Sequence, residues 1–580
     1  MTPTPRAPLP STAVVALRLF LEEAAAAMDA TLRQAAVSAS IGRHGNTAAG
    51  FYAPTGALLL GGRESHPLLL EAAAESLAFL ISCHAATDRL FAAGELHLTN
   101  DAGSAAAGIE DVVLATPILR DGRLVAFVAL TASHSGLGPA TLAPVEHLRR
   151  EGLILPWMRA GHLGRIQNET LTLLATNTDD PTEFREEFAA QVHGLGLGRD
   201  AIEEALERFG VEGLLGLGEV AVSGAQRALQ QILGRLDVQE IVGRAAPFTV
   251  RIRRDGPPVS VRIEGPAESQ DSQVTAALAR ASVRSALREI LATEAPTLAV
   301  LGGLTEGLSI QCDLSIDPDA RPTSEARFLR TQAVADAVRA AFAGNLAHLT
   351  HAPDSGCFLV DLHGKREDGS RYHTRLGLPG GLGASVFGDG LTHGASTFSP
   401  HRTRGVEEIE RSLPVRVLRY EILPDSAGPG QYHGGSAARL ELLLLEGRAE
   451  ADVLVPDRAI GMQGGMRGND ARVLHITLRD GTQETRGPAQ ATLRLEAGDR
   501  LVMESSGGGG WGIPFQRSIM RLEEDLVRGT ITADQSRNRY GLILKPGGLE
   551  KDDYLTYRVR HYLLSTLAVE DIIAGEELLD

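Results

Sequence analysis

The stretch GDRLVMESSGGGGWGIP, residues 498–514, joins a short apolar run to the densest glycine cluster of the chain. A loop that binds nucleotide phosphates needs backbone N–H groups converging at a helix N-terminus, usually with a lysine. This stretch has no lysine, and Gly512 and Pro514 disfavour a helix. It therefore predicts a strand followed by a tight turn. There glycine would supply positive φ, the backbone would pass close to another element, and Trp511 would anchor the packing.

Composition places the whole chain among ordinary globular proteins. With 580 residues it is too long for a single core, and three or four packed units are expected. The formal net charge of −17 disfavours nucleic acid and anionic membranes as partners. The three cysteines are far apart, and no basic leader or uninterrupted membrane-spanning apolar run is evident. These features predict a cytoplasmic protein without disulfides that does not bind membranes.

Periodicity along the chain predicts a mixed α+β, multi-domain fold. Apolar residues recur at helical spacing near the N-terminus and across 182–235, whereas short apolar strands alternate with turns from residue 413 onward. The predicted units are a disordered lead (1–14), an N-terminal α/β domain (15–165), a helical region (166–245), a mixed α/β domain (246–412), a β-rich domain (413–515) and a C-terminal helical tail (516–580).

Several motifs follow one another in a familiar order. They are GELHLTNDAG (94–103), EGLILPWMRAG (151–161), RYEILPDSAGPGQYHGG (419–435), DRAIGMQGGMRG (457–468) and the opening stretch (498–514). In sequence and spacing they resemble the hydantoinase B/oxoprolinase family over nearly the whole chain. The resemblance implies a hydantoinase B-like fold with a β-rich C-terminal unit.

The resemblance also implies a function. Such chains are B-type subunits of heteromeric enzymes, in which a hydantoinase A-type partner binds ATP and phosphorylates the carbonyl oxygen of a small substrate. The leading expectation is hydrolysis of a cyclic amide such as a hydantoin, 5-oxoproline or a lactam. Two alternatives stay open: a subunit of an ATP-dependent ketone carboxylase of the acetone or acetophenone type, and a non-catalytic scaffold subunit.

A metal site is implied by the same resemblance, but several of its positions are changed here. In NDAGSAAAGIED (100–111), Gly108 stands where the family has histidine, and Asp111 keeps the acid. In AFVALTASHSG (126–136), Ser133 replaces the first histidine of a pair, and His134 is retained. We therefore take Asp111 and His134 as candidate catalytic residues and candidate metal ligands.

A third motif of the implied metal site is ESHPLL (64–69). Here Ser65 and Leu69 occupy histidine positions, His66 is shifted by one residue, and Asn46 stands at an earlier acidic position. His66 is a further candidate ligand, although a one-residue shift on a strand turns a side chain to the opposite face. Two ligands hold a divalent ion poorly, so Zn²⁺ or Mn²⁺ in this chain stays an open alternative.

Each candidate has a structural alternative. His134 could equally be a satisfied loop histidine, and Asp111 a turn acid. Asn100 and Asp101 are typical of residues that shape a loop. Four polar residues could line an anion or phosphate path, although a solvated loop explains them as well: His393, His401, Arg402 and Arg404. Asp425 and Tyr432 are expected to fix a turn, and Arg458 next to Asp457 is expected to form an internal ion pair, with a substrate clamp as the alternative.

Overall fold

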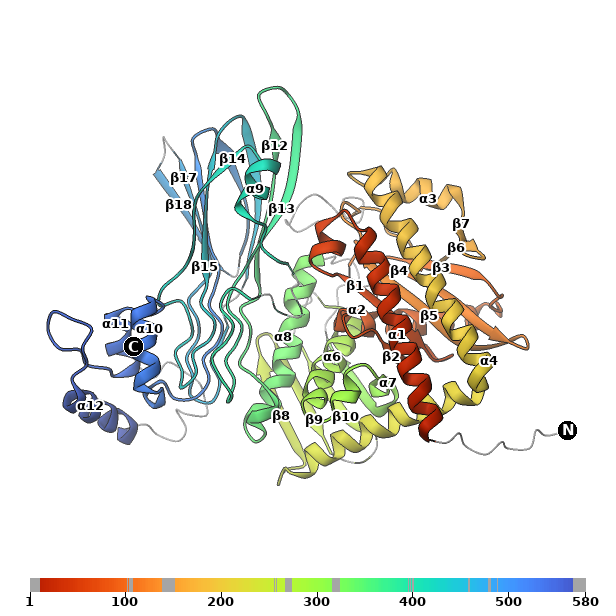
Figure 1. Ribbon diagram of the computed structural model, residues 1–580, viewed down its shortest axis with the longest axis horizontal. Coiled ribbons are helices and arrows are strands. Elements are labelled where there is room, and N and C mark those ends of the chain that lie inside the picture. The colour runs from red at the N-terminus through yellow and green to blue at the C-terminus, as the bar shows by residue number, and fades with distance from the viewer. Residues whose placement is uncertain are drawn as a thin grey trace. The chain divides into compact units, whose positions relative to one another are not determined.

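The computed structural model describes residues 11–566, except 102, 104–107, 138–151, 255, 257, 267–273, 315–323, 395, 397, 399–400, 457–458, 478–480 and 488. The chain forms two compact units, the first ending at Val338 and the second beginning at Arg339 (Figure 1). Most of the predicted N-terminal lead, residues 1–10, lies outside the described residues. The lead was predicted to reach residue 14, but the first helix already begins at Ser11.

The first unit is built on a seven-stranded sheet in the order β2-β1-β5-β4-β3-β6-β7, in which every neighbouring pair is antiparallel. Asp121 and Gly122 form the tight turn between β4 and β5, both with positive φ. The strands are β1 (Thr47–Tyr52), β2 (Leu58–Gly61), β3 (Glu95–Thr99), β4 (Asp111–Arg120), β5 (Arg123–Ser133), β6 (Met158–His162) and β7 (Arg165–Ile166).

Helices cover both faces of this sheet. On one face, α4 (Pro181–Gly234) lies beside α1 (Ser11–Ala35), and its Gly194 and Gly198 approach Leu130 and Val128 of β5 (Figure 1). On the other face, the Tyr52 hydroxyl donates to a carbonyl of α2 (Pro67–Ala86). The even-numbered residues of β5 thus face α4, and the odd-numbered ones face α2.

Two helices of the first unit differ from simple expectation. The predicted helices 182–195 and 198–235 are joined as α4, and the interruption falls at Gly210, whose φ is 67°. Gly194 and Gly198 do not end the helix, because their close packing on the sheet compensates for their weak helix propensity. Among the described helices, α2 alone is long and apolar enough to cross a membrane, and 61% of that stretch is buried inside the protein.

A second, smaller sheet completes the first unit, in the order β11-β10-β9-β8. Within it, β9 and β10 pair antiparallel; residues 255 and 257, between these strands, lie outside the described residues. The buried helix α6 packs on α2. The elements are β8 (Glu240–Ala245), β9 (Phe248–Arg253), β10 (Val259–Glu264), β11 (Leu308–Asp313), α3 (Asn168–Ala175), α6 (Ala276–Glu294), α7 (Leu304–Gly307) and α8 (Ser324–Ala343).

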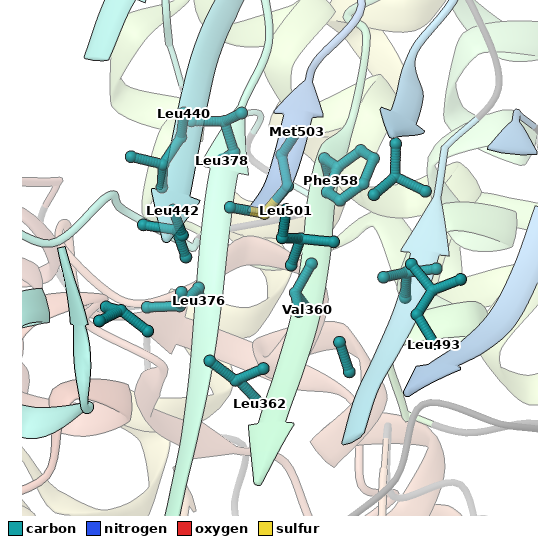
Figure 2. Packing of buried hydrophobic residues seen from close by; sticks show 14 of the residues in the cluster. Phe358, Val360, Leu362, Leu376, Leu378, Leu440, Leu442, Leu493, Leu501 and Met503 are labelled. Atoms are coloured by element: carbon teal, nitrogen blue, oxygen red, sulfur yellow. The ribbon is translucent and has the colours of Figure 1, made fainter. Parts of the chain in front are cut away.

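Two packed antiparallel sheets form the second unit, and their inward-facing side chains make one core (Figure 2). Phe358 and Val360 from one sheet meet Leu501 and Met503 from the other. Strand β12 pairs with β13 on one side and with β16 on the other, so this β structure starts upstream of residue 413, inside the range expected to be mixed. The strands are β12 (Cys357–Lys365), β13 (Arg371–Pro379), β14 (Val415–Ile422), β15 (Ala438–Leu444), β16 (Arg448–Val455), β17 (Arg472–Thr477), β18 (Gly481–Arg486), β19 (Ala489–Glu496) and β20 (Arg500–Glu504).

The glycine run after β20 lies in the middle of several extended segments. A Cβ on Gly508 would lie 2.0 Å from the Leu382 carbonyl oxygen, and one on Gly510 would lie 2.1 Å from that of Pro429. The expectation of close backbone approach is confirmed, and Trp511 is buried. The expected positive φ is wrong for the run itself, 507–510, and occurs only at Gly512. Glycine is needed there because no side chain fits between the segments.

Helices follow the glycine run, as predicted for the tail: α10 (Ile519–Arg528), α11 (Ala533–Tyr540) and α12 (Asp553–Thr566). Arg517 ties this tail to the rest of the unit. Its buried guanidinium donates to Asp389 at 2.6 Å and to Asp525 at 2.8 Å, and His433 lies within 3.7 Å of both carboxylates. A buried cation between two acids stabilises this connection as long as all partners are present.

Candidate functional site

The residues at the altered metal-site positions meet at one end of the large sheet. Ser133 on β5 lies directly opposite Asp111 on β4. On the other side of β5, the Ser133 amide donates to the Asn46 carbonyl at 3.0 Å, next to the first pair of the β1–β5 ladder. Three chain segments that are far apart in the sequence thus bring Asn46, Ser133 and Asp111 side by side.

Two serine hydroxyls hold buried carboxylates in this region. Ser133 Oγ donates to Asp111 Oδ1, and Ser65 Oγ donates to Asp29 Oδ2 while accepting a 2.9 Å bond from the Ala49 amide. All four of these side chains are buried. Burial raises the pKa of Asp29, and the hydrogen bond from Ser65 offsets part of that rise.

His66 lies close to the same end of the sheet. It is the N-cap residue of α2 without a side-chain capping bond, and its amide donates to the Thr47 carbonyl at 2.8 Å. The imidazole is buried. Asn46 directly precedes Thr47, the first residue of β1. The structure therefore brings His66 into the neighbourhood of Asn46, as the resemblance implied.

His134 points the other way, into the layer beneath α4. Its Nε2 donates to Gln191 Oε1 at 2.9 Å. The orientation of the Gln191 amide follows from its Nε2, which donates to the carbonyls of Val112 and Leu130 at 2.9 and 2.8 Å. The oxygen must therefore face the histidine, and this network assigns a proton to Nε2.

The other ring nitrogen of His134 faces a buried carboxylate. Nδ1 lies 3.7 Å from Glu187 Oε2, too far for a normal hydrogen bond. Glu187 Oε1 accepts from the amides of Val37 and Ser38. Burial works to raise the pKa of Glu187, but the interaction with His134 and the bonds from Ser38 outweigh it and hold the pKa below its usual value. The Phe184 ring packs 4.9 Å from the imidazole.

The two candidate catalytic side chains are therefore not brought together. Ser133 and Asp111 lie on the face of the sheet that α2 covers, whereas the His134 ring is held against α4. The alternation of a strand separates neighbouring residues in this way. Because Ser133 and His134 are neighbours in the sequence, a single site was expected. The structure places their side chains on opposite faces of the sheet.

The donor set does not fit a metal ion. Across the part of the chain that the structure describes, no three His, Cys, Asp or Glu side chains gather as a metal site would require. At the sheet end, one Asp111 oxygen already accepts from Ser133, positions 46, 65 and 133 carry amide and hydroxyl groups, and His66 adds a single imidazole. Zinc and manganese sites in proteins use imidazole, thiolate or carboxylate ligands in larger number.

Several other predicted polar residues have structural roles. Asn100 Nδ2 donates to the carbonyls of Ile109 and Leu153, and Asp101 accepts from the Gly103 amide, as expected for loop-shaping residues. Asp425, at a φ of 58°, accepts from Thr532 and so fixes a turn, also as expected.

The loop after β13 is fixed at His393. This imidazole bonds the Pro379 carbonyl at 2.8 Å and the Tyr420 hydroxyl at 2.6 Å. Arg404 lies 3.8 Å from Glu408 on the following helix, Val406–Ser412. These contacts hold the loop to its own unit. The predicted pair Asp457–Arg458 lies outside the described residues.

Sequence reasoning missed the partners of His134. Glu187 and Gln191 are four residues apart on α4, on the same face as Phe184 and Phe188. A glutamate and a glutamine on the apolar stripe of a helix are unusual and signal a buried polar contact. The buried cluster of Arg288 and Glu71 between α6 and α2 gave a weaker signal of the same kind.

Comparisons with known proteins agree with this architecture. The family model described as hydantoinase B/oxoprolinase matches residues 13–514. The chain is 23% identical to the caprolactamase subunit beta of Pseudomonas jessenii, over 81% of this chain and 85% of that protein. The crystal structure of the ATP-dependent caprolactamase from the same organism superposes with a TM-score of 0.80 at 21% identity, covering 95% of this chain and all of the other.

A ketone carboxylase has a similar fold. The nucleotide-free structure of acetone carboxylase gives a TM-score of 0.77 at 15% identity, covering 97% of this chain and 85% of that one. At these identities the superpositions establish the fold, which amide-cleaving and carboxylating relatives share. The family model spans nearly the whole sequence, and the chain belongs to the hydantoinase B/oxoprolinase family.

Proposed function

We propose that this chain is the B-type subunit of a heteromeric ATP-dependent enzyme that opens a cyclic amide. Its hydantoinase A-type partner would phosphorylate the carbonyl oxygen of the substrate, and this subunit would complete the hydrolysis. The observation that carries the proposal is the nearly full-length match to a family that includes the beta subunit of a caprolactamase. The absence of disulfides among its three cysteines fits a cytoplasmic location.

The glycine run supports placing ATP on the partner. The amides of Gly508, Gly509 and Gly510 donate to the carbonyls of Gly435, Pro353 and Met466, and the Gly507 amide donates to Asn469 Oδ1. A phosphate cradle needs such amides unpaired and convergent. In this chain they hold the fold together, which supports a nucleotide site on the proposed partner.

Within this proposal, Asp111 and His134 have separate roles. A phosphorylated carbonyl is labile in water and must react in a pocket shielded from solvent. Asp111, at the sheet end, is our candidate for the group that faces the activated substrate. His134 would act as a positioning residue, because it joins α4 to the ends of β4 and β5 through Gln191 and Glu187.

One observation favours a second candidate function, the non-catalytic scaffold. Serines occupy two positions where the resemblance expects histidines, and each serine is bonded to a buried carboxylate. A chain that had lost catalytic activity but kept its fold would show this pattern. The two candidates differ in whether Asp111 matters for turnover.

The test is to co-express the chain with an A-type partner and measure ATP hydrolysis with hydantoins, 5-oxoproline, lactams, and small ketones with bicarbonate. We expect turnover only with a cyclic amide and only when both subunits are present. Asp111→Asn should abolish product formation while the subunits still copurify. Turnover with ketone and bicarbonate instead would support the carboxylase, and full activity of Asp111→Asn would support the scaffold.

A further inference from the structure

We infer that serine–aspartate hydrogen bonds take the place of a metal ion at the end of the large sheet, so that the first unit folds and stays folded without one. The inference concerns the stability of this chain and does not depend on the substrate proposed above. It rests on the disagreement between the metal site that the family resemblance implies and the side chains found there.

The first step in the argument is geometric. Ser133 and Asp111 are directly opposed on neighbouring antiparallel strands, where Cβ atoms are about 4.5–5.5 Å apart. Two short side chains span this gap with one hydrogen bond, and Ser133 Oγ donates to Asp111 Oδ1. A carboxylate oxygen that would otherwise be available to a cation is thereby committed to a neutral donor.

The second step concerns charge. Buried carboxylates are costly unless they are paired or hydrogen-bonded, and a divalent ion is one way to meet that need. Here each of two buried carboxylates has a hydroxyl donor: Asp111 has Ser133, and Asp29 has Ser65. Asp29 also lies in the field of Arg33, which donates to the Thr47 hydroxyl. The hydroxyls and this arginine offset part of the cost without an ion, and burial still raises the pKa of Asp29.

The third step concerns the backbone segments that these serines connect. Ser133 and Ser65 also hold backbone: the Ser133 amide donates to the Asn46 carbonyl, and Ser65 Oγ accepts from the Ala49 amide. These bonds join β4, β5 and β1 to the segment before α2. A structural metal ion would connect the same pieces, so the hydrogen bonds perform the mechanical part of its role.

The experiment combines metal analysis with thermal unfolding of the full-length chain. As purified, the chain should carry well under one equivalent of metal, and its Tm should be unchanged by a chelator or by excess Zn²⁺ or Mn²⁺. Stoichiometric metal that Asp111→Asn removes would overturn the inference. So would a Tm that falls with chelator or rises with added ion.

Side-chain variants supply the second arm. Ser133→Ala should lower Tm by several degrees, because it leaves a buried Asp111 oxygen without its donor. Ser133→Thr keeps the hydroxyl and should retain most of the stability. The matched control is Thr131→Val on the same strand and face, since Thr131 is buried and its hydroxyl has no hydrogen-bond partner.

The control should melt at or above the wild-type temperature. Equal melting of Ser133→Ala and Thr131→Val would refute the role of the Ser133 hydroxyl. If Ser133→Ala fails to accumulate as folded protein, the metal and chelator measurements on the wild-type chain still decide. None of these outcomes depends on enzymatic activity, so failure of the proposed function and failure of this inference can be told apart.

Discussion

At the scale of single residues, the buried network around His134 explains why this histidine is retained. Its Nε2 proton is committed to Gln191, which in turn is bonded to Val112 and Leu130. Every buried polar group in such a network needs a hydrogen-bond partner. Removing one side chain leaves its partners buried without a hydrogen bond that compensates for their desolvation. The same residue in solvent would contribute almost nothing to stability.

His134→Ala should therefore destabilise the first unit by about 1–3 kcal/mol, because Gln191 Oε1 loses its donor and a cavity forms beside Phe184. His134→Gln can place an amide donor near the same oxygen and should recover part of the loss. Denaturant unfolding of the three proteins measures the effect. A large loss of turnover with unchanged stability would instead give His134 a chemical role.

A second residue-scale prediction concerns His97 on β3. Burial lowers the pKa of His97 to about 4 from 6.5, although Glu95, 3.2 Å away, works in the opposite direction. Because the folded-state pKa is the lower one, the stability contribution is complete above pH 6.5 and is lost as the pH falls toward 4. The neighbouring imidazole of His84 also has a lowered pKa, chiefly through burial.

Comparison with His97→Gln isolates this effect from other titrating groups. Between pH 7.5 and pH 5, the wild-type chain should lose about 2 kcal/mol more unfolding free energy than the variant. Urea unfolding at the two pH values measures the difference. Parallel pH dependence of the two proteins would contradict the buried, neutral state of His97.

Sequence reasoning identified the candidate residues of the site but not their grouping. Motif order pointed to the positions of Asp111, His66 and Ser133, and the strand register brings those segments to one end of the sheet. Motif order could not show that the His134 side chain lies on the opposite face of the sheet from Asp111. That placement depends on which face of β5 is covered by α4. Glu187 and Gln191 lie more than 50 residues further along the chain, and only the tertiary structure connects them to His134.

At the scale of elements, hairpins and amphipathic helices were the most predictable parts. Their signals are local: the Asp121–Gly122 turn sets the β4–β5 register, and apolar spacing sets α1. The continuity of α4 and the pairing of β12 with β16 are decided by packing between distant segments. Extended glycine segments carry no periodicity, which is why their side-by-side arrangement could not be read from the sequence.

The glycine run gives a prediction at this scale. Gly508→Ala should destabilise the second unit by about 1–3 kcal/mol or more, because the new methyl group would lie 2.0 Å from the Leu382 oxygen. Gly388→Ala is the matched control, since a Cβ there meets nothing within 4 Å. Thermal unfolding and the yield of folded protein measure both. Equal stability of the two variants would contradict the packing argument.

Arg517 gives a prediction for the C-terminal helices. Arg517→Ala leaves the carboxylates of Asp389 and Asp525 without their main cation and should cost about 3–5 kcal/mol. Limited proteolysis should then cut the chain near α10 faster than in the wild type. Arg528→Ala, at the exposed end of the same helix, should leave the cleavage rate unchanged. Similar cleavage of both variants would show that Arg517 is not the anchor.

At the scale of the whole molecule, each unit has a core of its own. The large sheet of the first unit and the packed sheets of the second both bury extensive apolar surface, the main source of folding free energy. The predicted mixed, multi-domain fold is confirmed, but the chain forms two compact units where composition predicted three or four. Composition could not reveal that one sheet extends upstream of residue 413, because residues 366–447 separate β12 from its partner β16 along the chain.

One prediction belongs to this scale. The isolated chain should hydrolyse no ATP above background, and hydrolysis should appear only after an A-type subunit and substrate are added. The physical reason is that the amides of its glycine run are already bonded within the protein. A phosphate-release assay with each subunit alone and with both together measures this. Nucleotide turnover by this chain alone would contradict the division of labour.

The crowded glycine segments also affect how sequences of this kind are sorted. Wherever a methyl group would strike a neighbouring backbone, lack of space alone accounts for the glycine, whatever reaction the protein performs. The glycines of 498–514 are therefore explained by the fold, which caprolactamase and acetone carboxylase also have. Assigning members to one chemistry or the other should start from the residues where β1, β4 and β5 end together.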